Sequence, residues 1–275
     1  MANPRLPARN QSGRRWKVLI CEVEMSKVIF VTGATSGFGE ASARLFATNG
    51  WKVVATGRRL ERLEKLRDDF PTGTIHIAQI DLMDRDTIVA AIADLPDAFK
   101  PITCLLNNGG LALGSNPVPD IRLEDWRIMV ETNIMGLIHT TQEMIPLLKS
   151  AGKGASIINI GSVASRFAYP GGNVYGATKA FVKQFSLNLR TDLAGTAIRV
   201  TDLEPGMGKS EFQKVRSYGD DEANEKFYEG VEPILPEDMA ETVWWLANRP
   251  AHININTIEV MPLCQVPARP NVIRD

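Results

Sequence analysis

The chain has 275 residues, of which 44% are hydrophobic and 23% are charged, and its formal net charge is −1. Charges of both signs are interspersed and no run of about 18 apolar residues occurs, so we expect neither a nucleic-acid partner nor a membrane span. The three cysteines and three histidines are scattered, which argues against a disulfide framework and against a metal site.

The first 24 residues differ in composition from the rest. Residues 1–17 hold five basic side chains and no acidic one. We expect residues 1–24 to be a disordered extension or an upstream start, and residues 25–275 to form one folded domain. A mitochondrial-type transit segment, which is also Arg-rich and acid-poor, is the alternative.

A glycine-rich turn follows the first predicted strand. The apolar, β-rich segment 27–32 precedes Gly33-Ala-Thr-Ser-Gly-Phe-Gly39, and a helical pattern covers 40–49. Strand, glycine turn and helix together direct free N–H groups and the helix dipole at a phosphate group. We therefore predict nucleotide contacts at Gly33, Thr35, Ser36, Gly37, Phe38 and Gly39, with a merely flexible turn as the alternative.

Two arginines follow the second predicted strand, at 51–56. An NAD site would hold an acidic residue here for the ribose 2′-hydroxyl, whereas Arg58 and Arg59 can bind a 2′-phosphate. The pattern predicts NADP(H) as the cofactor, with two solvated arginines at a helix start as the alternative.

Polar and small residues follow the next two strands. The third strand, at 74–80, precedes Asp81 and Leu82, and the fourth, at 102–106, precedes Asn107, Asn108 and Gly109. Helices are expected at 60–70 and 84–95. The carboxyl ends of parallel strands form the ligand crevice of an α/β sheet, so we expect these residues to line the nucleotide site.

The second half of the chain supplies candidates for acid–base chemistry. A helical stretch at 123–149 has Asn133 at its centre, the fifth strand (156–160) precedes Ser162, and a helix at 175–193 carries Tyr175 and Lys179. Residues four apart lie on one helix face, and a nearby ammonium lowers the pKa of a phenol. Tyr175 is therefore a candidate proton donor and acceptor.

The remaining segments complete an alternation of strands and helices. The sixth strand, at 198–203, leads to Pro205 and Gly206, and a helix at 236–248 precedes the seventh strand at 257–261. This alternation predicts an α/β fold: a single domain with a doubly wound (Rossmann) parallel seven-stranded sheet and helices on both faces.

Taken together, these motifs resemble the short-chain dehydrogenase/reductase family over residues 25–275. The resemblance rests on Thr32-Gly33-x-x-x-Gly37-x-Gly39, Asn107-Asn108-x-Gly110, Asn133, Ser162, Tyr175-x-x-x-Lys179 and Pro205-Gly206. The family's usual Asn-Asn-Ala-Gly reads Asn-Asn-Gly-Gly here. The family implies Tyr175 as acid and base, Lys179 as the group that lowers its pKa and binds the nicotinamide ribose, Ser162 at the developing oxyanion, and Asn133 in a water relay.

Longer segments resemble two groups within the family. Residues 56–59, 111–114, 172–182 and 252–256 are similar to NADP-dependent 3-hydroxy acid dehydrogenases, which act on serine, allo-threonine and 3-hydroxypropionate-type acids. Residues 25–41 and 155–162 are as similar to sulfoacetaldehyde reductases, which form isethionate. A third hypothesis, a non-catalytic NADP-sensing protein, predicts a lost catalytic residue, and none is lost.

Both groups imply a small substrate with an anion beside the reacting carbon. Candidates to bind that anion are Arg166, Tyr169, Asn173 and Arg216, together with Ser162 and Tyr175 at the reacting group. Residues 207–212, expected to form a mobile lid, are one residue shorter than in the hydroxy acid group, which leaves the substrate open. The resemblance also implies a cytoplasmic homodimer or homotetramer that pairs through its two long helices, and the apolar residues 260–272 suggest an arm that packs on a neighbour.

Overall fold

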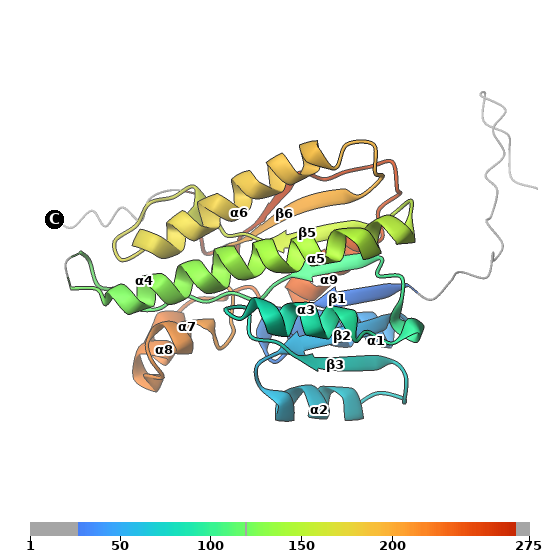
Figure 1. Cartoon of the computed structure of the whole chain (residues 1–275). Coiled ribbons are helices and arrows are strands. Elements are labelled where there is room, and N and C mark those ends of the chain that lie inside the picture. The colour runs from blue at the N-terminus through green and yellow to red at the C-terminus, as the bar shows by residue number, and fades with distance from the viewer. Residues whose placement is uncertain (1–26, 119, 268–275) are drawn as a thin grey trace, which may run out of the picture.

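Figure 1 shows the computed structural model of the chain, which describes residues 27–118 and 120–267. The predicted extension at 1–24 lies outside the described residues. Within them, every helix is too short or too polar to cross a bilayer.

A seven-stranded sheet forms the centre of the molecule, with all neighbouring strands parallel and the spatial order β3-β2-β1-β4-β5-β6-β7. The strands are β1 (Val28–Val31), β2 (Lys52–Gly57), β3 (Ile75–Gln79), β4 (Cys104–Asn107), β5 (Ser156–Ile160), β6 (Arg199–Pro205) and β7 (Thr257–Val260). The order reverses between β1 and β4, which is where a doubly wound sheet opens its ligand crevice. The predicted fold is confirmed.

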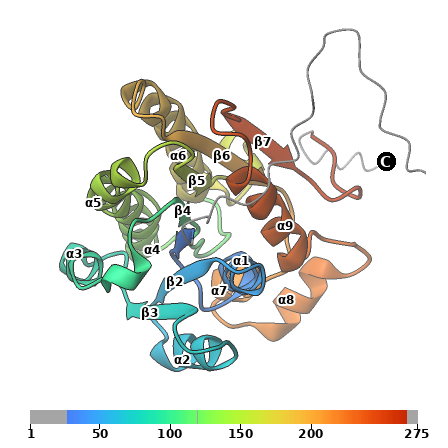
Figure 2. The same cartoon turned by 90° about the vertical axis from the view of Figure 1, so that its right-hand side faces the viewer.

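Helices cover both faces of this sheet, as the end-on view in Figure 2 shows. One face carries α1 (Gly37–Thr48), α2 (Leu60–Asp68) and α9 (Pro236–Ala247). The other carries α3 (Arg85–Ala93), α5 (Gly136–Ala151) and α6 (Asn173–Asp192). Shorter helices are η1 (Asp97–Phe99), α4 (Leu123–Val130), η2 (Glu131–Met135), η3 (Val163–Ser165), α7 (Phe212–Arg216) and α8 (Asp221–Tyr228).

The two faces form separate apolar cores because side chains alternate along each strand. In β1, Ile29 and Val31 join the core under α1 and α9, whereas Val28 and Phe30 join the core under α5 and α6. All four are buried, as expected for a strand covered on both faces. The central strands are therefore fixed from both sides, and their carboxyl ends hold the site residues in place.

Two features differ from the sequence prediction. The helical stretch predicted at 123–149 is interrupted by η2, a π-helical turn that contains Asn133. The residues after Gly206, expected only as a lid, form the two helices α7 and α8. Residues 207–228, which we call the lid, lie beside the carboxyl edge of the sheet (Figure 1).

Candidate active site

The glycine turn between β1 and α1 is held in a shape that only glycine permits. Gly33 and Gly37 have φ values of 68° and 54°, in the left-handed region. A Cβ on Gly39 would lie 2.3 Å from the Gly33 carbonyl oxygen. The Asn108 side chain donates to the carbonyl oxygens of Thr32 and Gly33 at 3.0 and 3.1 Å. The turn is thus a rigid cradle that leads into the N-terminus of α1, where the first N–H groups have no partner inside the helix.

A cavity of about 330 Å³ extends from this cradle toward the start of α6. Most of the predicted cofactor residues lie on its wall: Gly33, Thr35, Ser36, Gly37, Phe38, Arg58, Arg59, Asn108, Gly109, Tyr175, Lys179, Pro205 and Gly206. Asp81 and Leu82 line a smaller adjoining pocket that also includes Arg58. A backbone cradle, a free cation and a long groove fit a dinucleotide with an extra phosphate.

Asn107 and Gly39 lie off this wall. The Asn107 side chain is buried and donates to Thr141 Oγ1 at 3.0 Å and to Asn159 Oδ1 at 2.9 Å. It connects β4 to α5 and β5 behind the cavity, so its contacts do not support the predicted nucleotide contact. Gly39 acts through the close approach of α1 to the turn.

The two predicted phosphate-binding arginines have different surroundings. The Arg58 side chain is exposed, and its guanidinium meets no hydrogen-bond or ion-pair partner among residues 27–118 and 120–267. Arg59 instead donates to Thr35 Oγ1 and Ser36 Oγ, both at 2.9 Å, and to Glu211 at 2.7 Å. Arg58 therefore has a free guanidinium, whereas that of Arg59 already fastens the glycine turn to the lid.

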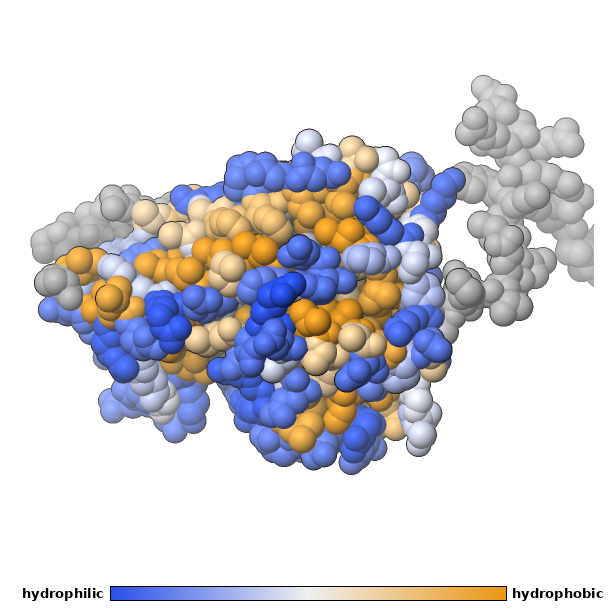
Figure 3. All heavy atoms as spheres, in the orientation of Figure 1, coloured by the Kyte–Doolittle hydropathy of each residue, from blue (hydrophilic) through white to orange (hydrophobic). Residues whose placement is uncertain are grey.

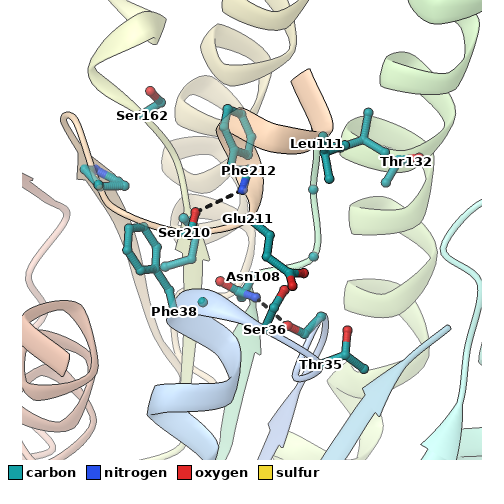
Figure 4. A pocket seen from close by; sticks show the side chains of 18 of the residues that line it. Thr35, Ser36, Phe38, Asn108, Leu111, Thr132, Ser162, Ser210, Glu211 and Phe212 are labelled. Atoms are coloured by element: carbon teal, nitrogen blue, oxygen red, sulfur yellow. Dashed lines mark hydrogen bonds between the residues drawn. The ribbon is translucent and has the colours of Figure 1, made fainter. Parts of the chain in front are cut away.

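Glu211 is the lid residue that makes this connection, and no sequence motif singled it out. Its carboxylate accepts from Arg59 and Arg62, each at 2.7 Å. Partial burial alone would raise the pKa of Glu211, but the two guanidiniums hold it below its ordinary value. Figure 4 shows Ser210 and Glu211 lying over Ser36 and Asn108. The lid thus closes over the glycine turn.

Ser162, Tyr175 and Lys179 meet at the other end of the cavity. Ser162 follows β5, and its Oγ accepts from the Ala164 N–H at 3.1 Å, so its own proton is free to point elsewhere. Lys179 Nζ donates to the Ile160 carbonyl oxygen at 2.7 Å and lies 5.9 Å from the Tyr175 ring centre. The structure therefore brings together a hydroxyl, a phenol and an ammonium that lie on two separate elements.

The protein's own groups shift the pKa values of the two catalytic candidates. Burial raises the pKa of Tyr175, whereas the Ser162 hydroxyl and the charge of Arg216 lower it. The net shift is upward, opposite to the direction we expected from Lys179, because the phenol is almost completely enclosed. Burial also lowers the pKa of Lys179, to about 8, and the nearby Asp202 carboxyl group opposes this effect.

Asn133 bonds to the segment after β4, where Leu111 lines the cavity. Its Oδ1 accepts from the Leu111 N–H at 2.9 Å, and its Nδ2 donates to the Leu111 carbonyl oxygen at 2.8 Å and to Thr178 Oγ1 at 3.1 Å. It therefore ties the loop after β4 to α6, one residue before Lys179. π-helical turns are frequent at functional sites, and here the turn aims the Asn133 amide at both partners.

The four anion-binding candidates lie off the cavity wall and differ in their contacts. Arg166 pairs with Glu204 at 2.6 Å and Glu259 at 3.4 Å, and Asn173 accepts from Trp126 Nε1 and the Val174 N–H. These contacts favour structural roles for both. Of the four, Arg216 and its neighbour Tyr169 lie close to the Tyr175 phenol.

Arg216 connects the lid to the loops beside Tyr175. Its guanidinium donates to the carbonyl oxygens of Gly114 and Gly171 and to Tyr169 Oη, at 3.1–3.3 Å. It also lies 5.9 Å from the Tyr175 ring centre. Phe212, at the start of the same helix α7, packs on Tyr175, with ring centres 5.4 Å apart. Gly110, part of the family motif, also lies on the wall, and wall residues that the sequence did not single out are Leu111, Thr132, Ile160, Gly161, Gly208, Ser210, Glu211, Phe212 and Val215.

Within the described parts of the chain, no group of His, Cys, Asp or Glu side chains could hold a metal ion. The arrangement offers proton transfer and charge stabilisation next to a nucleotide cradle.

Comparisons with known proteins agree with this arrangement. Residues 27–220 match the family described as short chain dehydrogenase. The chain is 53% identical over 239 residues to the NADP-dependent 3-hydroxy acid dehydrogenase YdfG of Salmonella typhi, covering 86% of this chain and 96% of the relative. It is 48% identical over 242 residues to sulfoacetaldehyde reductase 2 of Chromohalobacter salexigens, covering 88% and 96%.

A solved structure described as the closed form of serine dehydrogenase complexed with NADP+ is also similar. It superposes with a TM-score of 0.86 at 50% identity and covers 90% of this chain and 100% of that chain.

Proposed function

The chain belongs to the short-chain dehydrogenase family, and we propose that it interconverts a small 3-hydroxy acid and its oxo acid or semialdehyde. It is an NADP-dependent oxidoreductase that acts on CH–OH groups. The substrate and the roles of the individual residues are the proposal. The observation that supports them best is the meeting of Ser162, Tyr175 and Lys179 in one cavity with the glycine cradle.

NADP(H) bound along the cavity would supply or accept the hydride. The residues proposed to hold it are those of the glycine turn, Arg58, Asn108 and Lys179, because they line the wall and offer N–H groups or positive charge. Arg58 is the group proposed for the 2′-phosphate, since its guanidinium has no other described partner.

In the reduction direction, the proposed role of Tyr175 is to give its phenolic proton to the oxygen of the former carbonyl group. Burial keeps its pKa high, so the phenol carries that proton at neutral pH. Ser162 donates a hydrogen bond to the same oxygen, and the Lys179 ammonium stabilises the phenolate that remains. In the oxidation direction, Tyr175 accepts the hydroxyl proton. Asn133 supports the return of the proton to solvent through Lys179.

We propose that the anion of the substrate lies beside Arg216 and binds its guanidinium. This guanidinium is the cation that the lid brings closest to Tyr175, and a bidentate arginine suits a carboxylate. The sulfonate alternative rests on the short lid segment 207–212 and on the similarity to a sulfoacetaldehyde reductase, since lid length alters the space beside the anion.

Initial rates decide between these substrates. NADPH is tested with sulfoacetaldehyde, malonic semialdehyde and succinic semialdehyde, and NADP+ with L-serine, L-allo-threonine and 3-hydroxypropionate. We expect the carboxylate compounds to have the higher kcat/KM. A tenfold preference for sulfoacetaldehyde, about 1.4 kcal/mol in transition-state binding, would replace the proposal with isethionate formation. Absence of turnover with every compound would refute both.

We further propose that the chain forms a homodimer or homotetramer through α4, α5 and α6. Apolar side chains gather over these helices on the face shown in Figure 3, and Leu123 is 76% exposed. A cytoplasmic location, expected from the sequence, is proposed with it. Of the predicted C-terminal arm, residues 268–272 lie outside the described residues. Gln265 contacts the Met207 N–H of its own chain, while Leu263 is fully exposed.

A further inference from the structure

Two carboxyl groups are buried directly behind the catalytic lysine. Asp202 and Glu204 lie two apart on β6, so both face α6, and neither is exposed to solvent. On α6, Lys179 and Lys183 are one turn apart and face this pair. Lys183 Nζ lies 2.9 Å from Glu204 Oε1. Two buried carboxyl groups thus face two lysines, one of which is the catalytic candidate.

The Asp202 carboxyl group fills the space left by a glycine. A Cβ on Gly161 would lie 2.3 Å from Asp202 Oδ1, so the carboxyl group lies against the Gly161 backbone. The preceding residue is Ile160, whose carbonyl oxygen accepts from Lys179 Nζ at 2.7 Å. Asp202 therefore lies behind the short segment to which the catalytic ammonium is bonded.

The hydrogen bonds around the two acids are unequal. Glu204 is better supplied: Lys183 and Ser165 donate to its Oε1, and Arg166 forms an ion pair with its Oε2 at 2.6 Å, although that oxygen accepts no hydrogen bond from a described residue. Neither oxygen of Asp202 accepts a hydrogen bond from any described residue. An ionised carboxylate buried without donors, next to a second carboxylate, is costly. A proton on Asp202 lowers that cost, because the two carboxyl groups lie within hydrogen-bonding reach of each other and the protonated acid can donate to Glu204.

The charged groups around Asp202 favour the same position for the proton. Burial raises the pKa of Asp202, the neighbouring Glu204 raises it further, and Lys179 and Lys183 oppose both effects. Burial also raises the pKa of Glu204, but Lys183, Arg166 and the proton on Asp202 outweigh it and leave the pKa low. The remaining charged group nearby, Glu259 of β7, faces Arg166. The pair therefore holds one negative charge, on Glu204, and one proton, on Asp202.

We propose that Asp202 is a positioning residue for the reaction: it shares its proton with Glu204 and sets the pH at which Lys179 loses its charge. The proposal rests on the catalytic role proposed for Lys179. As the pH rises, Asp202 releases its proton and the new carboxylate holds the Lys179 ammonium charged, so the two groups titrate as a coupled pair. The pair thereby extends the alkaline range of the enzyme.

Two isosteric variants test this inference because they shift the profile in opposite directions. Asp202→Asn removes the group that becomes negative, so Lys179 loses its proton at lower pH. Glu204→Gln moves the single negative charge onto Asp202, next to Lys179, so the ammonium survives to higher pH. Glu259→Gln is the matched control, since Glu259 contacts Arg166 but not the catalytic lysine.

The measurement is kcat/KM for oxidation by NADP+ from about pH 6 to about pH 10, with L-serine, or with isethionate if the sulfonate proves to be the substrate. We expect the alkaline limb of Asp202→Asn to move by about one pH unit to lower pH, that of Glu204→Gln to move upward, and that of Glu259→Gln to stay. An unchanged limb in Asp202→Asn, or shifts of both carboxyl variants in one direction, would overturn the inference.

A measurement on the wild-type protein covers the case in which a variant does not fold. Infrared spectra at neutral pH should contain the C=O stretch of a protonated carboxyl group that disappears as the pH rises. Absence of that band would also overturn the inference. Lys179→Met separates the proposal for Lys179 from the proposal for Asp202. Turnover retained in this variant would refute the catalytic role of Lys179. Lost turnover, together with an unchanged pH profile in Asp202→Asn, would refute the role of Asp202 alone.

Discussion

Replacing Arg58 with alanine should weaken the binding of NADPH far more than the binding of NADH. The Arg58 side chain is exposed at the end of β2 and borders both cavities, and its guanidinium is unpaired within the described residues. Charge-assisted hydrogen bonds contribute about 1.5–3 kcal/mol when enclosed, and solvent screening reduces this at an exposed site. We therefore expect Arg58→Ala to weaken NADPH binding by about 1.4–2 kcal/mol, or roughly 10- to 30-fold in Kd.

The assay is a titration of the protein with NADPH and with NADH, followed by cofactor fluorescence. NADH lacks the 2′-phosphate, so its Kd should change less than about twofold. Arg59→Ala is the internal control. Arg59 already binds Thr35, Ser36 and Glu211, so its loss should loosen the glycine turn, weaken both cofactors by similar factors and lower the melting temperature.

Equal weakening of NADPH and NADH by Arg58→Ala would refute this role of Arg58, because the side chain would then contact a part that both cofactors share. A change in the ratio of the two Kd values in Arg59→Ala alone would refute it as well. In that case Arg59 would have to leave Glu211 to bind the phosphate, and the contacts described above would not represent the binding state.

Three further variants test the site. Tyr175→Phe should lower kcat by about 10²–10⁴-fold and leave the Kd of NADPH almost unchanged; normal turnover would remove Tyr175 as the proton donor. Gly39→Ala places a Cβ 2.3 Å from the Gly33 carbonyl oxygen and should lower the free energy of unfolding by about 1–3 kcal/mol. In the control Gly176→Ala the nearest atom would be 3.1 Å from the new Cβ, so its melting temperature should fall less. Glu211→Gln should destabilise the closed lid by about 1 kcal/mol, because its two ion pairs are partly exposed. The KM of the hydroxy acid should then rise a few-fold relative to the control variant Glu222→Gln. An unchanged KM would show that the ion pairs do not hold the lid.

The sequence was sufficient to predict the sheet and the residues that follow its strands. Short apolar segments alternate with helical patterns, and parallel strands bring their carboxyl ends to one edge. The glycine turn, Ser162 and Tyr175 were therefore expected at one site, and the structure places them on the wall of one cavity. NADP as the cofactor was predicted from two residues, Arg58 and Arg59, and is confirmed by the comparisons.

Side-chain direction was harder to predict than position along the chain. Asn107 is the last residue of β4, and its side chain points at α5, whereas Asn108 points at the glycine turn. Adjacent residues at a strand end point to opposite sides, so a strict use of strand alternation would have assigned Asn107 to the core. Arg166 was placed near the substrate because it is close to Ser162 in sequence, but its partners Glu204 and Glu259 lie on β6 and β7.

The contacts of the lid explain why the sequence identifies the family but does not identify the substrate. The family motifs are local, since each consists of a few residues at a strand end or on one helix face. The proposed substrate side is built from long-range contacts: Arg216 bonds to backbone at Gly114 and Gly171, and Glu211 pairs with Arg59 and Arg62. Neither set of contacts has a fixed spacing in sequence. A one-residue change in 207–212 would shift the lid at both of its contacts, because Glu211 anchors it at Arg59 and Arg62, and Arg216 lies beside Tyr175. Lid length would therefore alter the space for the substrate's anion without changing any family motif.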